Sequence, residues 1–272
     1  MRKVSVSAWL VIAISAAGVL CENARASAGT LWVNDDASSY VPPGMNCQQA
    51  GYATIKAALG AAVSSDTVKV CPGAYAENLV IVTQDLTLVS TGGAIDTIIA
   101  PTVHQSVIQI AATGVTVKGF TIVPAGVQDG DLGVFVALSG NTGANLMRNV
   151  VRGGRIGINL GCGSNATKIS YNDVSGQTEA GINIDTCEAP PFPGSNNNSV
   201  HHNTACSVTA TASIALGGTV SGNKVHHNTA TTISSFGTKN KIHHNTTQVA
   251  IVDNSGGSNK LKHNIVDSSV CP

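Results

Sequence analysis

The stretch Asn223-Lys-Val-His-His-Asn228 decides the fold, because related copies recur through the second half of the chain. Each copy has a central aliphatic residue between polar ones and ends in asparagine. We call these final residues the anchor asparagines: Asn149, Asn172, Asn203, Asn228, Asn245 and Asn264. The interval between anchors varies from 17 residues (228 to 245) to 31 residues (172 to 203). Such an irregular interval argues against a coiled coil and predicts a solenoid whose coils differ in loop length.

A second pattern, glycine followed by alternating aliphatic residues, supports the same fold. It recurs every 24 residues at 133–136, 157–160 and 181–184, and in a serine-led form at 213–216. Strand alternation places the aliphatic residues on one face and Phe135, Asn159 and Asn183 on the other. Each coil therefore consists of short strands and turns, without room for a crossover helix.

The anchor asparagines are predicted to build the fold and to do no chemistry. A sharp bend between two strands requires a left-handed backbone, which asparagine tolerates. Stacked asparagines can also exchange hydrogen bonds between their side-chain amides. We therefore expect the anchors to occupy left-handed bends and to form a ladder along the solenoid.

The first part of the chain contains the features of an N-terminal cap. Residues 53–63 place Ile55, Ala58 and Leu59 on one helical face. A strand-like segment with a Pro-Gly-x-Tyr turn follows at 66–75. With the repeated anchors, these features resemble the right-handed parallel β-helix repeat family, which has the pectin-lyase-like fold.

This resemblance implies an all-β protein, a right-handed single-stranded parallel β-helix with a short N-terminal capping helix. Residues 29–65 would contain the N-terminal strand and the cap. Residues 66–272 would contain about nine coils, stacked at about 4.8 Å per strand.

The beginning of the chain has the three parts of a secretory signal peptide. Two basic residues at positions 2 and 3 precede an apolar run over 8–20 and a small-residue segment that ends at Ala28. The apolar run is too short for a comfortable membrane span. We therefore expect residues 1–28 to be a signal peptide and residues 29–272 to be one secreted or periplasmic domain.

The charge composition limits the choice of partners. The chain has 15 basic and 15 acidic residues, and only 11% of its residues are charged. A nucleic-acid partner would require a basic stripe that neutralises phosphates, so we expect none. The resemblance to the β-helix family implies polysaccharide as the partner, and we expect a monomer.

Six cysteines follow the predicted cleavage site, and an even number in an exported chain indicates disulfides. Two of them lie at similar distances after Gly157 and Gly181, so they should sit on neighbouring coils within disulfide reach. Another pair would fasten the N-terminal segment to the first coil, and the last pair follows by elimination. The predicted pairs are Cys162–Cys187, Cys47–Cys71 and Cys206–Cys271.

A row of charged residues lies two positions before the strand glycines: Asp131, Arg155 and Glu179. In one interpretation they are a surface salt-bridge ladder worth under about 1 kcal/mol per pair. In the other, Arg155 binds a uronate carboxylate while the acids act as catalytic acid and base or hold Ca²⁺. Apart from this Ca²⁺, no cofactor is predicted. The substrate-binding residues predicted around this row are Phe135, Arg152, Asn159, Asn183 and Asp185.

Histidines precede the later anchors, at His202, His227 and His244. Imidazoles stacked about 5 Å apart on neighbouring coils could bind a divalent transition metal. The fold also resembles that of a periplasmic copper-delivery family. The alternative is that these histidines are polar turn residues in contact with water.

The resemblance implies several activities, because one fold carries many functions. The strands lack the Asn-Thr-Asp, Asp-Asp and Gly-His-Gly motifs of polygalacturonase-like members, and the Asp-Pro-His-Asp of epimerase-like members is absent. We predict a secreted protein that binds extracellular or cell-envelope polysaccharide, and leave catalysis open. The alternatives are a polysaccharide lyase or glycoside hydrolase, a structural or adhesive solenoid, and a periplasmic metal-binding protein.

Overall fold

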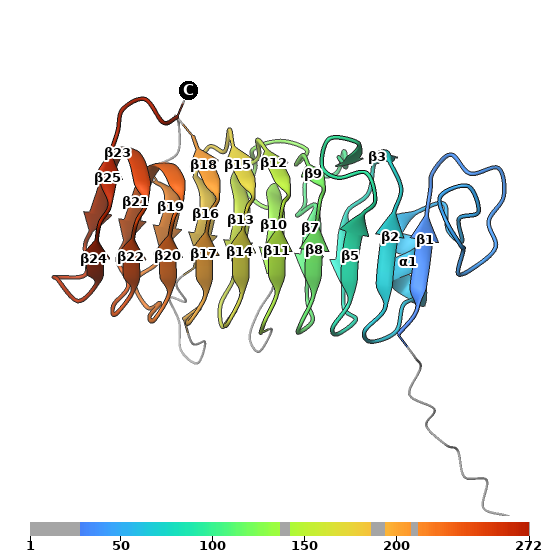
Figure 1. The fold of residues 1–272 in the computed structure, drawn as a ribbon, viewed down its shortest axis with the longest axis horizontal. Coiled ribbons are helices and arrows are strands. Elements are labelled where there is room, and N and C mark those ends of the chain that lie inside the picture. Colours follow the sequence, from blue (N-terminus) through green and yellow to red (C-terminus); the bar gives the residue numbers. More distant parts are fainter. Residues whose placement is uncertain (1–27, 137–141, 186–193, 208–211, 272) are drawn as a thin grey trace, which may run out of the picture.

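The computed structural model describes residues 28–136, 142–185, 194–207 and 212–271, which wind into one elongated parallel β-helix (Figure 1). Every pairing between its strands is parallel, and three rows of strands run along its length. The predicted signal peptide lies outside the described residues, apart from Ala28 at its end. None of the described helices is both long enough and apolar enough to cross a membrane.

Row 1 is a sheet of ten strands. In order along the sheet they are β1 (Thr30–Val33), β2 (Thr67–Val70), β5 (Thr87–Ser90), β8 (Thr116–Lys118), β11 (Asn145–Met147), β14 (Lys168–Ser170), β17 (Ser199–His201), β20 (Lys224–His226), β22 (Lys241–His243) and β24 (Lys260–Lys262). Nine strands follow β1 among the described residues, which agrees with the prediction of about nine coils.

Rows 2 and 3 belong to a second sheet. Row 2 contains β3 (Gly73–Tyr75), β6 (Thr97–Ile99), β9 (Thr121–Ile122), β12 (Val150–Arg152), β15 (Asp173–Ser175) and β18 (Thr204–Cys206). Row 3 contains β4 (Leu79–Ile81), β7 (Ile108–Ile110), β10 (Leu132–Val136), β13 (Ile156–Leu160), β16 (Ala180–Ile184) and β19 (Ala212–Leu216). The rows meet at the long strand β21 (Thr229–Ser235), which pairs with β23 (Thr246–Asp253), and β25 (Ile265–Val266) pairs with β23.

The core is a set of aliphatic columns that run along the inside of the rows. In row 1 the central residues lie in register on successive strands, and each is fully buried: Leu146, Ile169, Val200, Val225 and Ile242. Each column is continuous because every coil supplies one inward aliphatic residue at the same height. The central aliphatic residue of the repeated motif is therefore the core residue.

The anchor asparagines form the predicted ladder immediately after the row 1 strands. The Oδ1 atom of each anchor accepts hydrogen bonds from the previous anchor, beginning with Asn172 and Asn149 and ending with Asn264 and Asn245. These asparagines satisfy buried backbone groups at each bend, where an unpaired group would cost about 1–3 kcal/mol.

The prediction that the anchors themselves occupy the left-handed bends is wrong. The left-handed residue is the one before each anchor, with φ between 50° and 56°: Arg148, Tyr171, His202, His227, His244 and His263. This residue turns the chain and points its side chain outward, which leaves the asparagine free to turn inward. Histidine is among the residues that tolerate this conformation.

A short helix closes the N-terminal end, as the sequence predicted. Helix α1 (Ile55–Ala61) buries Ile55, Ala58 and Leu59 against the first coils. Thr54 caps the helix by accepting a hydrogen bond from Ala57 N, and the Glu77 carboxylate accepts from Ile55 N and Lys56 N. The helix therefore covers the end of the core that β1 and β2 would otherwise expose to water (Figure 1).

Two of the three predicted disulfides are present. Cys47 and Cys71 join the N-terminal segment to the first coil, with Cα atoms 5.7 Å apart. Cys206 and Cys271 join β18 to the C-terminal tail, with Cα atoms 5.5 Å apart, because the tail folds back along the outside of the coils (Figure 1). The third pair includes Cys187, which lies outside the described residues, so Cys162–Cys187 stays a prediction.

Candidate functional site

The outward middle positions of row 3 form a continuous column along the solenoid. Their aliphatic neighbours on each strand turn into the core, which leaves these positions on the outer face. In register along the row the column is Val80, Gln109, Phe135, Asn159, Asn183, Ala215, Ser234 and Val252. The alternation in the sequence correctly placed Phe135, Asn159 and Asn183 side by side, and their role in binding stays a prediction.

The two asparagines of this column differ in accessibility. Asn183 Nδ2 donates a hydrogen bond to Asn159 Oδ1 at 2.9 Å. Asn159 is buried, whereas Asn183 is partly exposed. The amide of Asn183 can therefore contact a ligand, and Asn159 holds it in position.

A hollow of about 420 Å³ opens on the same face, over β4, β7 and β10. Its lining combines apolar side chains with hydrogen-bonding ones: Asn78, Leu79, Val80, His104, Gln105, Ser106, Gln109, Gly130, Leu132 and Phe135. The partly exposed Phe135 ring offers a flat apolar surface at its edge. A hollow with an aromatic side chain and several polar groups is the usual form of a small-ligand site.

A histidine–aspartate pair borders this hollow. His104 Nδ1 lies 2.9 Å from Asp131 Oδ2, and Asp131 also accepts a hydrogen bond from Gln128 N at 2.7 Å. The Asp131 side chain is fully buried, while that of His104 is 46% exposed. A buried carboxylate bound to Nδ1 orients the imidazole, and this arrangement serves histidines that act as general acids or bases.

The sequence prediction missed His104. The sequence contains one signal that could have found it, because the other seven of the eight histidines lie in the repeated motif. Its partner Asp131 belongs to the predicted charged row. The sequence spacing does not show that His104, 27 positions earlier, reaches Asp131, because one coil with its loop separates the two residues.

The charged row lies on neighbouring coils, but its three side chains do not converge. Arg155 N donates to Asp131 O at 2.9 Å, and Glu179 N donates to Arg155 O at 3.0 Å, so the backbones are in register. The Arg155 guanidinium pairs with Glu179 and lies 3.6 Å from Asp129. Asp131 turns inward to His104 instead. Arg155 and Glu179 therefore form an ion pair on the outer face, and their catalytic role stays a prediction.

The two other predicted charged contacts lie away from the centre of the face. Arg152 ends β12 in row 2, and its guanidinium contacts Asp173 at 2.6 Å and Ser175. A corner of three residues, Gly153, Gly154 and Arg155, separates it from β13 in row 3. Asp185 directly follows β16 at the other edge of row 3 and is partly exposed. The contacts of Arg152 and Asp185 with a substrate stay predictions.

The histidines of the repeated motif form two stacked columns on the outside of row 1. The first column contains His201, His226 and His243, and the second contains His202, His227, His244 and His263. Ring centroids within a column are 4.8–5.1 Å apart. Within each coil, the two Nδ1 atoms approach to 2.9–3.0 Å.

In the first column the successive rings are nearly parallel, with interplanar angles of 2–10°. Among the described residues, no group of three or more His, Cys, Asp or Glu side chains is placed to hold a metal ion. Binding of a transition metal by His202, His227 and His244 therefore gains no support from the geometry. It stays a prediction, and so does Ca²⁺ at the charged row.

The first histidine column is held in its neutral form. Burial lowers the pKa of His226 to about 4, and repulsion from the surrounding imidazoles adds to this effect. Burial also lowers the pKa of His201 and of His243, with smaller contributions from neighbouring histidines and from Lys168 and Lys241 respectively. At neutral pH this column is therefore an uncharged stack.

The fold defines the class to which the chain belongs: it is a right-handed parallel β-helix protein. An alginate lyase from Paenibacillus is similar over 88% of this chain and 99% of its own, with a TM-score of 0.52 and 9% identity. A pectin methylesterase from Aspergillus niger is similar over 91% and 89%, with a TM-score of 0.49 and 14% identity. At 9% identity the likeness to the alginate lyase shows the fold alone. No family model and no curated protein matches the sequence.

Proposed function

We propose that this protein acts outside the cytoplasm and binds a polysaccharide chain along the outer face of row 3. The observation that carries the proposal is the column Gln109, Phe135, Asn159 and Asn183, which borders the 420 Å³ hollow. It presents the Phe135 ring and the amides of Gln109 and Asn183, on strands that are spaced about 4.8 Å apart. An extended chain of sugar rings fits such a face, because each ring can stack on the aromatic side chain or bond to an amide.

Three further observations support this proposal. The Arg155–Glu179 ion pair borders the face, and a guanidinium is well shaped to bind a uronate carboxylate. The alginate lyase that shares the fold is named for its action on a polysaccharide. The two disulfides and the predicted signal peptide fit an oxidising compartment outside the cytoplasm.

Replacing Phe135 with alanine is expected to weaken binding by about tenfold or more, because a central aromatic contact is often worth about 2 kcal/mol. A glycan array selects the polysaccharide, and calorimetric titration of the wild type and the variant measures the effect. Phe236→Ala is the matched control, since Phe236 is exposed beyond the end of β21. Equal affinity of Phe135→Ala and wild type would place the binding site elsewhere.

The His104–Asp131 pair favours a second function, elimination within a uronate-containing polysaccharide. His104 would take the proton next to the uronate carboxylate, and the electrons of the broken C–H bond would form a C=C bond. The glycosidic oxygen would leave with the electrons of its C–O bond and take up a proton from the imidazolium or from water. Arg155 would neutralise the carboxylate. The buried Asp131 would stabilise the imidazolium that forms.

If this second function is correct, His104→Gln should lower the rate of unsaturated-product formation by at least about a hundredfold while binding persists. His244→Gln is the control, because it removes an exposed imidazole from a different row. Absence of unsaturated product from the wild type, on a polysaccharide that it binds, would leave binding as the function.

A further inference from the structure

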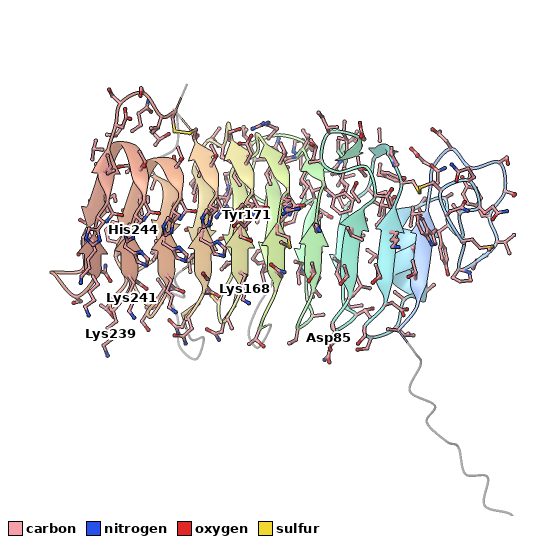
Figure 2. All side chains as sticks on the ribbon, viewed as in Figure 1. Asp85, Lys168, Tyr171, Lys239, Lys241 and His244 are labelled. Carbon is pink, nitrogen blue, oxygen red and sulfur yellow. A yellow bond between two sulfur atoms is a disulfide. The ribbon has the colours of Figure 1, made fainter. Side chains whose placement is uncertain are left out.

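The outer face of row 1 carries a concentration of basic side chains in its last coils. The first residues of the strands from β14 onward include Lys168, Lys224, Lys241 and Lys260, with Ser199 between the first two. The last strand position and the following bend supply the two histidine columns. We call this surface the lysine–histidine face; Figure 2 shows Lys168, Lys241, His244 and Tyr171 on this side of the solenoid.

The lysines of this face form a row of positive charge. The lysines lie in register on neighbouring strands, so their charges repeat at intervals of about 4.8 Å. None of the four ion pairs found among the described residues includes a lysine or histidine of this face. Like charges placed side by side in a sheet are destabilising. A ligand with several negative charges would remove this repulsion.

The surface between these side chains is hollowed in two places. One hollow of about 320 Å³ is lined by Lys241, His243, His244, Lys260, Lys262 and His263. Another of about 380 Å³ lies around Lys168 and Lys224. The hollows lie on the same face, and the columns around them run parallel to the solenoid axis. The shape therefore suits a narrow, extended ligand that crosses several coils.

The histidines add a response to protons. The groups that face the first histidine column are the second histidine column, Lys168 and Lys241. All of them oppose protonation of the first column. The neighbouring Tyr171 ring stacks on His202, with the ring centroids 4.9 Å apart. An anion bound across the rings would favour the imidazolium form. Binding should therefore tighten as the pH falls, because each added proton then contributes a further attraction.

We propose that the lysine–histidine face binds a linear acidic polysaccharide that carries sulfate or carboxylate groups. The lysine and histidine columns run along the solenoid axis, and each strand adds side chains about one strand spacing further along it. This arrangement matches a single extended chain. Double-stranded DNA is a poorer match, since it presents one negative charge per about 1.7 Å and requires a wide basic surface. This proposal does not rest on the function proposed for row 3, which lies on a different face.

Dextran sulfate is the probe, and unmodified dextran is its matched control with the same backbone. Calorimetric titration at low salt should show binding of dextran sulfate and none of dextran, with affinity at pH 5.5 at least about tenfold higher than at pH 7.5. The double variant Lys224→Gln, Lys241→Gln should lose about tenfold or more in affinity. The control Lys56→Gln removes a positive charge from helix α1, at the opposite end of the solenoid, and should change affinity by less than about twofold.

The double variant His226→Gln, His243→Gln should show a weaker dependence of dextran sulfate affinity on pH than the wild type, while circular dichroism shows a folded protein. Three results would overturn the proposal: no binding of dextran sulfate at pH 5.5, a loss from Lys56→Gln as large as the loss from the double lysine variant, or tighter binding of single-stranded DNA or polyphosphate than of dextran sulfate. Phe135→Ala tests row 3 separately, because it should leave dextran sulfate binding on the lysine–histidine face unchanged.

Discussion

Replacing Asn203 with alanine is expected to lower the free energy of unfolding by about 3–5 kcal/mol. The Asn203 side chain is buried and lies in the middle of the ladder. Its Oδ1 accepts from Asn172 N and Asn172 Nδ2, both at 2.9 Å, and its Nδ2 donates to Ile169 O, His201 O and Asn228 Oδ1. Alanine would leave several of these buried groups without a partner, and water cannot easily replace the lost amide.

Asn264→Ala is the matched control at the end of the ladder. Asn264 accepts from Asn245 and donates to Ile242 O, but it is only partly buried, so water can replace its contacts. We expect a loss of about 1 kcal/mol or less. Urea unfolding followed by far-ultraviolet circular dichroism measures both variants. Equal losses in the two variants would contradict the view that the ladder stabilises the fold by satisfying buried backbone groups.

The protein is expected to lose stability as the pH falls from 7.5 to 5. The folded-state pKa of His226 is about 4, whereas the unfolded value is about 6.5. Between these values the unfolded chain binds more protons than the folded one, so stability is complete above about pH 6.5 and falls toward pH 4. After allowance for solvent screening, His226 alone is expected to lower the free energy of unfolding at pH 5 by about 1 kcal/mol. His201 and His243 change stability in the same direction.

Thermal unfolding at several pH values tests this prediction in the absence of any polyanion. A loss of about 1 kcal/mol corresponds to a decrease of about 2–4 °C in Tm for a chain of this size. The variant His226→Gln should show a smaller decrease between pH 7.5 and 5 than the wild type. A wild-type Tm that stays constant over this interval would show that the histidine stacks do not resist protonation.

The architecture could be predicted because each coil repeats the same physical requirements. The aliphatic residues at Val200, Val225 and Ile242 mark the core, and the asparagines that follow them mark the bends. The error about the left-handed residue has a clear cause. Both members of a His-Asn pair tolerate that conformation, and only the hydrogen-bond needs of the buried backbone decide which of them turns inward.

The candidate sites were harder to predict than the fold, because they depend on loops. Asp131 was correctly placed one coil before Arg155, yet its side chain turns inward to His104, which comes from the loop before β7. Sequence spacing fixes the height of a residue along the solenoid when it lies on a strand. It does not fix how far a loop residue reaches back, and the pairing of His104 with Asp131 depends on that reach.

The central claim, that row 3 binds a polysaccharide, is tested most directly by a crystal structure with the oligosaccharide that the glycan array selects. We expect electron density for an extended chain over β7, β10, β13 and β16, with one sugar ring on Phe135 and contacts to Gln109 and Asn183. Density confined to row 1, to row 2 or to either end of the solenoid, with row 3 bare, would contradict the claim.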